Sequence, residues 1–254
     1  MQDAVASPSP RTGIQAIARA GGVLRALEAA PAGLALGELA TAVGLPKSTV
    51  HRLVQALADE DLVRTGAGGR IRLGPGLARL GAAAHDALAD TLRHPLQDLR
   101  RDLDETADLA VLDGASVRFI DQAPAPHRLR AVSAVGSAFP LHCTANGKAL
   151  LSGLTDDAIR DLLPAQLTRF TGTTITTRAA LLGELDAVRR TGVAFDREEH
   201  TDGISAVAAL VTDGSGPVAA MSVPVPTQRF TGNEARYAAA VRAAADAASA
   251  LLAG

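Results

Sequence analysis

One stretch of the sequence combines side chains that donate hydrogen bonds with an absence of negative charge. It follows Pro46, and no acidic residue occurs before Asp59. Its polar members are Lys47, Ser48, Thr49, His51, Arg52 and Gln55. Lysine and arginine bind phosphate oxygens, and arginine, glutamine, serine and threonine also reach the edges of bases in the major groove. The chemistry that these residues could perform is recognition of duplex DNA.

A second set of residues could in principle support catalysis or bind a metal. It comprises His142, Cys143, Asp196, Glu198, Glu199 and His200. Nucleophilic catalysis by a cysteine needs a base beside the thiol, and a metal site needs several ligands that converge on one point. No local signature surrounds the cysteine, and neighbouring side chains of an extended segment point to opposite faces. We therefore expect Cys143 to be a small core residue, with no catalytic residue, metal or cofactor in the protein.

Asn146-Gly147-Lys148 contains the Gly-Lys pair of a phosphate-binding loop but lacks the upstream glycine of that motif. The pattern does not predict nucleotide binding. We expect Gly147 to permit close packing at the start of a helix instead.

Two short helices would position the donor-rich stretch. Apolar residues recur at helical spacing at Leu36, Leu39, Ala40 and Val43 and again at Val50, Leu53, Val54 and Leu57. Gly44 is a stop signal between them, and Pro46 suits a first helical turn, where its missing N–H would be unpaired. The spacing predicts a helix-turn-helix whose second helix begins beside Lys47, although helical hairpins of ordinary cores share this spacing.

A basic hairpin is expected directly after these helices. Residues 62–64 and 70–73 are short alternating segments that flank the glycine-rich stretch 65–69. They place Arg64, Arg70 and Arg72 on one side. A hairpin of this kind is a wing that would meet the phosphates beside the groove.

The run from Ile14 to Gly81, which includes GELATAVGLPKSTVHRLVQALADEDL, resembles the DNA-binding domain of the isocitrate lyase regulator (IclR) family of bacterial transcription factors. VGSAFPLHCTANGKALL, LDAVRRTGVAFDREEHTDGISAVAA and VAAMSVPVP resemble its effector domain, in the family's order. The resemblance implies a winged helix-turn-helix, a linker helix and a curved antiparallel sheet related to GAF and PAS domains. It also implies a homodimer or homotetramer that binds a palindromic operator, a small-molecule effector and a role as a repressor.

The resemblance further implies a ligand pocket in the C-terminal domain. Its residues would be Leu129, Leu141, Ala145, Asn146, Asp196, Ala206 and Ser222. The family often has a polar residue where Ala206 stands and a serine where Pro224 stands, which favours a bulkier or less polar effector than a short oxoacid. Two alternatives remain open: Asp196 as a surface carboxylate beside Arg197, and Ser222 as a core serine bonded to backbone.

Composition is compatible with two folded domains. The 254 residues are 47% hydrophobic and include one cysteine, which excludes an internal disulfide and fits the cytoplasm. No run of about 18 apolar residues predicts a membrane span, and no signal peptide is expected. Residues 1–75 contain 8 lysines and arginines against 6 acidic residues, whereas residues 76–254 contain 17 against 21. The sign of this asymmetry suits a DNA-binding head and an acidic body.

We expect an α+β protein with a loose tail at 1–11, a winged helix-turn-helix at 12–75, a linker helix at 76–90 and an effector-binding and oligomerisation domain at 91–254. A helix from Ile14 to Leu27 completes the head and, by resemblance, packs against its copy in a partner. Helices are predicted at 92–106, 146–152, 156–163, 178–191 and 233–252, and strands at 107–112, 117–121, 129–135, 193–196, 205–212 and 217–225.

Three function classes follow from these features. A ligand-responsive transcription factor accounts for the head, the wing and the sensor-like body. An enzyme with an incidental winged helix would turn over a metabolite through His142 or Cys143, and a protein-interaction module would bind its partner without salt dependence. The sequence identifies neither the effector nor the operator, and it leaves open whether ligand relieves repression or promotes activation.

Overall fold

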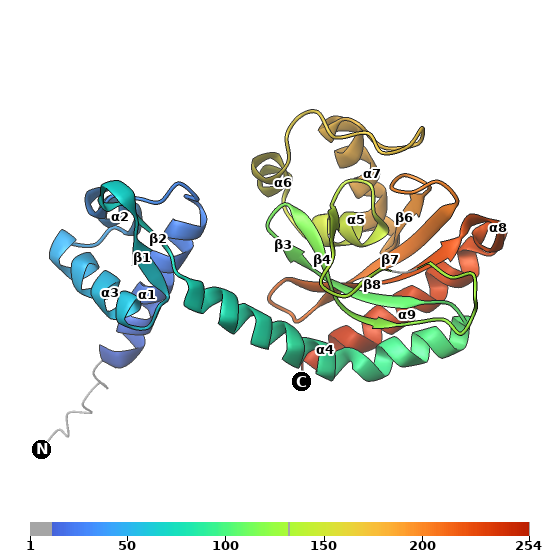
Figure 1. Ribbon diagram of the computed structural model, residues 1–254, viewed down its shortest axis with the longest axis horizontal. Coiled ribbons are helices and arrows are strands. Elements are labelled where there is room, and N and C mark those ends of the chain that lie inside the picture. Colours follow the sequence, from blue (N-terminus) through green and yellow to red (C-terminus); the bar gives the residue numbers. More distant parts are fainter. Residues whose placement is uncertain (1–11, 132, 254) are drawn as a thin grey trace, which may run out of the picture. The chain divides into compact units, whose positions relative to one another are not determined.

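A computed structural model describes residues 12–131 and 133–253. The chain divides between Ala84 and His85 into two compact units, here called the first and second unit (Figure 1). This division falls inside the segment predicted as the linker. The predicted tail at 1–11 lies outside the described residues.

The first unit is a helical domain with a short hairpin. Its helices are α1 (Thr12–Glu28), α2 (Leu36–Val43) and α3 (Lys47–Asp59), followed by β1 (Val63–Thr65), a short 3-10 turn η1 (Ala67–Gly69) and β2 (Ile71–Leu73). Gly44 ends α2 at φ 64° and donates to the carbonyl groups of Ala40 and Thr41, a left-handed cap that favours glycine. The predicted helix-turn-helix and hairpin are therefore present.

Apolar residues at helical spacing form the core of this unit. The buried members are Val23, Leu27, Leu39, Val50, Val54, Leu57, Val63 and Ile71. All three helices and both strands contribute to this core. The apolar side of α3 packs against it, and the polar side of α3 faces away from it.

One long helix, α4 (Pro75–Leu103), replaces the two helices predicted at 76–90 and 92–106. The prediction of a break was wrong, because no glycine or proline occurs between Ala89 and Leu92 to stop the helix. Pro95 lies inside α4 and costs one backbone hydrogen bond. Burial of Leu92, Leu96 and Leu99 in the core offsets that cost.

The second unit contains a six-stranded antiparallel sheet. Its strands are β3 (Ala107–Asp113), β4 (Ser116–Ala123), β5 (Ala138–Pro140), β6 (Ala194–Arg197), β7 (Ile204–Thr212) and β8 (Pro217–Pro226). Their order across the sheet is β5-β4-β3-β8-β7-β6. Two hairpins, β3-β4 and β7-β8, thus meet at the centre, where Asp108 pairs with Ser222.

Helices cover both faces of the sheet, as the predicted α+β class requires (Figure 1). The C-terminal part of α4 and α9 (Glu234–Ala253) pack on one face, with Leu109 and Val207 from the strands. The helices α5 (Ala145–Ser152), α6 (Asp156–Leu162) and α7 (Arg178–Thr191) lie on the other, with Ala110 and Ala208. Because neighbouring residues of a strand point to opposite faces, Asp108 and Ser222 share the α5 face with Ala110 and Ala220.

The predicted strand at 129–135 is wrong. The described residues of this segment form no strand, and Leu129 and Val135 are exposed, so the apolar alternation does not reflect burial. Side chains bind its backbone instead: Thr106 Oγ1 donates to the Ala131 carbonyl at 3.1 Å and Gln122 Nε2 to the Ser133 carbonyl at 2.7 Å. No helix of the described residues is long and apolar enough to span a membrane.

Candidate functional site

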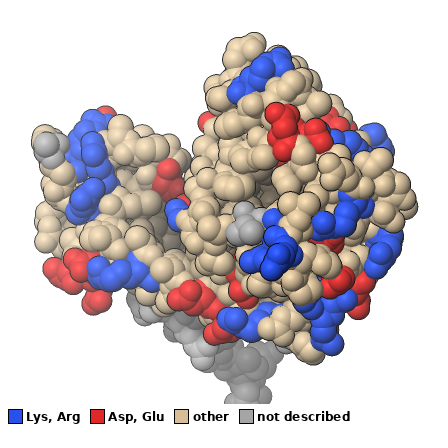
Figure 2. Space-filling view, turned by 45° about the vertical axis from the view of Figure 1, so that its right-hand side comes forward, with Lys and Arg blue, Asp and Glu red and all other residues tan. Residues whose placement is uncertain are grey.

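The polar residues of α3 lie on its solvent face. Lys47, Ser48, His51, Arg52 and Gln55 are exposed and Thr49 is half-buried. The apolar residues of α3 face the core, so these side chains are presented together to solvent. Charges of both signs are interspersed on the face of the molecule seen in Figure 2.

The three hairpin arginines are not equivalent, although the sequence suggested that they were. Arg70 donates through Nε and Nη2 to the Gly33 carbonyl at 3.0 and 2.7 Å, and its Nη2 lies 3.2 Å from Glu38 Oε2. Arg72 Nε donates to the Ala32 carbonyl at 3.1 Å. Both residues tie the hairpin to the loop after α1. Arg64 is exposed and pairs in register with Arg72.

A cavity of about 250 Å³ opens on the α5 face of the sheet in the second unit. Of the seven residues predicted for a pocket, five line it: Ala145, Asn146, Asp196, Ala206 and Ser222. Leu129 and Leu141 do not. Leu129 is 64% exposed on the loop that was mistaken for a strand, and Leu141 is 1% exposed within the apolar core beside α5.

Burial decides the open alternative for Asp196, whereas a buried Ser222 is compatible with both of its interpretations. Asp196 is 5% exposed and Ser222 is 3% exposed, and both side chains border the cavity. Asp196 is thus not a surface carboxylate. Its Oδ1 accepts from the Glu199 N–H at 2.7 Å, which places it at the base of a tight turn.

Several lining residues were not predicted from the sequence. They are Asp108, Phe119, Arg130, Ala131, Ser133, Phe139, His200, Thr201 and Ile204. Asp108 carried a signal that was overlooked, because it is a carboxylate inside the otherwise apolar segment Ala107–Leu112. A charged residue in a strand that is buried on both faces needs a specific partner or a function.

Burial raises the pKa of two carboxyl groups at the cavity to about 7. For Asp108, hydrogen bonds from Gln122 and Ser133 act against the desolvation, with Gln122 Nε2 at 2.7 Å from Oδ1. For Asp196, the backbone hydrogen bond from Glu199 lowers the pKa, whereas the negative charge of Glu199 raises it. Both groups therefore change charge near neutral pH.

The remaining wall of the cavity is largely apolar. Ala206 and Pro224, the two departures from the family pattern, are paired in register on β7 and β8. Phe119 and Phe139 meet edge to face at 5.1 Å, and the Phe139 ring stacks on His200 at 4.6 Å. A bound molecule would contact aromatic and aliphatic surface over much of its area.

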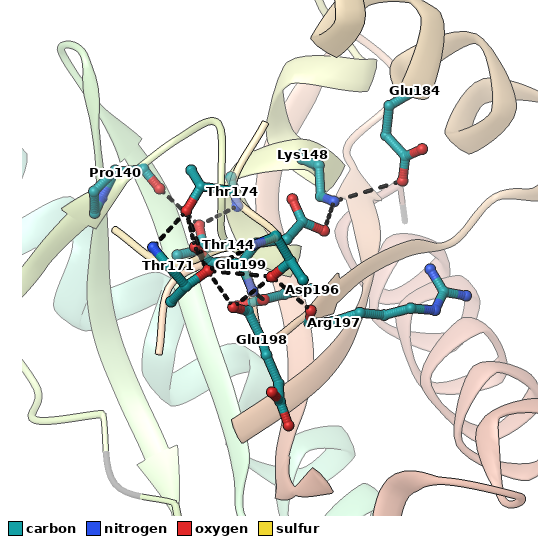
Figure 3. A network of polar contacts seen from close by, with 12 residues as sticks. Pro140, Thr144, Lys148, Thr171, Thr174, Glu184, Asp196, Arg197, Glu198 and Glu199 are labelled. Atoms are coloured by element: carbon teal, nitrogen blue, oxygen red, sulfur yellow. Dashed lines mark hydrogen bonds and ion pairs between the residues drawn. The ribbon is translucent and has the colours of Figure 1, made fainter. Parts of the chain in front are cut away.

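A polar network holds the turn that follows Asp196 (Figure 3). Lys148 is fully buried, with its Nζ 2.6 Å from Glu199 Oε1 and 3.5 Å from Glu184 Oε1. Thr171 and Thr174 donate through Oγ1 to the carbonyls of Glu198 and Glu199, both at 2.6 Å. Glu198 has φ 60°, a left-handed conformation that these bonds maintain. The network fixes the wall of the cavity between β6 and β7.

The His142-Cys143 pair does not form a nucleophilic site. Cys143 is fully buried, and desolvation raises the pKa of its thiol to about 12, so the thiol stays protonated. His142 Nε2 lies 2.9 Å from the Thr168 carbonyl. Within the described residues, no group of three or more His, Cys, Asp or Glu side chains could hold a metal.

Both units are similar to domains of known proteins. Residues 81–250 match the family model described as "Bacterial transcriptional regulator IclR C-terminal", and residues 16–66 match "IclR helix-turn-helix domain". The chain is 49% identical over 232 residues to the HTH-type transcriptional regulator Rv1719 of Mycobacterium tuberculosis, covering 91% of this chain and 90% of the relative.

Two further relatives extend the comparison. The transcriptional repressor IclR of Escherichia coli is 32% identical over 233 residues, covering 88% of this chain and 84% of the relative. The crystal structure of the Thermotoga maritima IclR superposes with a TM-score of 0.64 at 25% identity, covering 95% of this chain and all of that one (100%).

Proposed function

Because the chain belongs to the IclR family of bacterial transcriptional regulators, we propose that it is a repressor that responds to a small organic metabolite. It would act in the bacterial cytoplasm and bind a palindromic operator as a dimer or tetramer. The chain is a transcriptional regulator with a helix-turn-helix domain, and its relatives are regulators rather than enzymes.

The exposed face of α3 supports the DNA-binding part of the proposal. It offers lysine and arginine to phosphates, and arginine and glutamine to base edges, from one helix that can lie in the major groove. Arg64 would contribute a phosphate contact from the hairpin. Two copies of this domain would read half-sites whose centres lie about 34 Å, or a multiple of that, apart.

The single observation that carries the ligand-responsive part is the cavity of the second unit. It combines an apolar wall with a few buried polar side chains, the composition of a small-molecule site. The role of repressor rests on names among the relatives, such as that of the Escherichia coli protein. The continuous helix α4 begins in the first unit and ends in the second, so it is the covalent route by which a ligand would influence DNA binding.

The DNA-binding proposal is tested on a duplex selected from a random library by the full-length protein. Arg52→Ala should weaken binding and relax the sequence preference, because a base contact is lost. Arg72→Ala should weaken binding on all sequences alike, since Arg72 fixes the hairpin to the α1–α2 loop. Arg190→Ala, an exposed arginine of the second unit, is the matched control and should bind as the wild type does.

Two results would contradict this docking. If Arg52→Ala kept the wild-type DNA affinity and sequence preference at physiological salt, α3 would not be the helix that lies in the major groove. Partner binding that does not weaken as salt rises would instead favour a protein-interaction module, because contacts to phosphates release counterions.

The ligand-responsive part is tested by titration. A compound that raises the melting temperature in a screen of small metabolites is titrated into the protein with and without the selected duplex. We expect two different affinities, with a coupling of about 1–3 kcal/mol. Equal affinities would mean that the ligand does not regulate DNA binding, since coupling requires unequal binding to the two states.

A further inference from the structure

Three buried side chains of the cavity carry carboxyl or amide oxygens that accept hydrogen bonds. Asp108 is 1% exposed and Asp196 is 5% exposed, and they border the cavity from β3 and β6. Asn146, 3% exposed on α5, also borders it, and its Oδ1 has no hydrogen-bond partner among the described residues. Buried acceptors are costly when unpaired, so a bound molecule that supplies donors would be favoured.

Positive charge inside the protein does not neutralise these carboxyl groups. Lys148 lies near Asp196 but is already paired with Glu199 and Glu184. The neighbours of Asp108 are the uncharged Gln122 and Ser133. The cavity therefore has capacity for a positive charge that the chain itself does not fill.

Two basic side chains also lie on the cavity wall, Arg130 and His200. Arg130 is the one lysine or arginine among the described lining residues; it is exposed and donates through Nη1 to the His127 carbonyl at 3.0 Å. His200 also lines the cavity, and burial together with His142 lowers its pKa, which favours the neutral ring. Arg130 is exposed, whereas the Asp108 and Asp196 carboxyl groups are buried.

We propose that the cavity binds a small organic cation with an apolar body, such as an arylalkylamine, whose ammonium group donates to one of the two buried carboxylates, Asp108 or Asp196. The aromatic part would lie against Phe119 and Phe139 and beside the apolar Ala206–Pro224 pair. This inference rests on the proposed function, because it assigns a chemical class to the effector of that same site.

The charge of the ligand determines how binding depends on pH. With pKa values near 7 in the empty cavity, each carboxyl group is about one-tenth ionised at pH 6 and about nine-tenths ionised at pH 8. A cation binds to the ionised form, so its affinity should rise about tenfold per participating carboxyl group over this range. A carboxylate ligand requires the protonated form, and its affinity should fall over the same range.

The test uses three probes of similar shape: 2-phenylethylamine, 2-phenylethanol and phenylacetate. Each is titrated calorimetrically into the full-length protein at pH 6 and pH 8. We expect the amine to bind best at pH 8 and more weakly at pH 6, and to bind at least about tenfold more tightly than phenylacetate at pH 8. Of Asp108→Asn and Asp196→Asn, the variant that removes the paired carboxylate should reduce amine binding and its pH dependence, and the other should change them less. Asp246→Asn, an exposed carboxylate of α9, is the matched control and should change neither.

Three results would overturn the inference: tighter binding of phenylacetate than of the amine at pH 8, amine affinity that does not change with pH, or no amine binding at millimolar concentration. Thermal melts of each variant verify that it is folded.

Amine binding that leaves DNA affinity unchanged would contradict the regulatory coupling but not the ligand class. A carboxylate that binds the cavity and changes DNA affinity would contradict the ligand class but not the coupling.

Discussion

Asp108 makes the stability of the second unit depend on pH. Its pKa rises from 3.8 to about 7 on burial, so the folded state holds a proton that the unfolded chain has lost between these values. The contribution of this group to stability is complete below about pH 4 and is lost as pH rises through about 7. At about 1.4 kcal/mol per pKa unit, the loss has an upper limit of about 4 kcal/mol.

Asp108→Asn should therefore flatten the stability profile between pH 5 and pH 8, with the larger gain over wild type at pH 8. Asp196 has the same direction of shift, so part of the slope should remain. Tyr237, the single tyrosine, lies buried in the second unit, and the chain has no tryptophan. Its fluorescence during urea unfolding thus measures this unit alone. A profile identical to that of the wild type would mean that Asp108 is ionised in the folded protein.

Lys148 should be the most sensitive charged residue of the second unit. Lys148→Ala leaves the buried Glu199 without its partner, and loss of one member of a buried pair costs about 3–5 kcal/mol. The double variant Lys148→Met with Glu199→Gln should lose less than the sum of the two single variants, as measured by a double-mutant cycle in urea. Additive losses would show that the two side chains are not coupled.

At the scale of elements, Gly147 is required where α5 crosses the segment before it. A Cβ at this position would lie 2.1 Å from the Leu141 carbonyl oxygen, and backbone cannot easily move away. The prediction of close packing at this helix start is confirmed. Gly147→Ala should destabilise the second unit by at least about 1–3 kcal/mol, the usual cost of overpacking.

Gly183 in α7 is the matched control for this substitution. An added Cβ there meets no atom within 4 Å, so Gly183→Ala should be neutral or stabilise by up to about 1 kcal/mol through helix propensity. Both variants are compared by Tyr237 fluorescence in urea. Equal stability of the two would contradict the close approach of α5 and Leu141.

Elements with clear start and stop signals could be predicted from the sequence. The prediction of a helix at 178–191 matches α7 at both ends, because Thr177 caps its start and Gly192 its end. The segment 129–135 failed because its apolar alternation is not matched by a neighbouring strand. Side-chain roles were harder. The carboxylate of Asp108 inside an apolar strand was a signal that went unused, whereas the bound guanidinium groups of Arg70 and Arg72 depend on tertiary contacts that local patterns do not encode.

At the scale of the molecule, α1 leaves apolar surface that its own unit does not cover. Val23 and Leu27 are buried in the core of the first unit, whereas Ile17 is 76% exposed. An isolated exposed residue would be unremarkable. On a helix that the resemblance assigns to a partner contact, however, Ile17 marks the position where a second copy of the chain would pack.

Ile17→Glu should therefore weaken assembly and DNA binding together, because paired heads are needed to read paired half-sites. By light scattering at micromolar concentration, the wild type should have at least twice the 25.9 kDa mass of one chain, and the variant a lower mass. Ile17→Leu keeps the apolar contact and should behave as the wild type does. A wild-type mass of one chain would exclude the dimer. If Ile17→Glu kept both the wild-type mass and the wild-type operator affinity, the contact between copies would not involve this position of α1. A glutamate buried in that contact would weaken it.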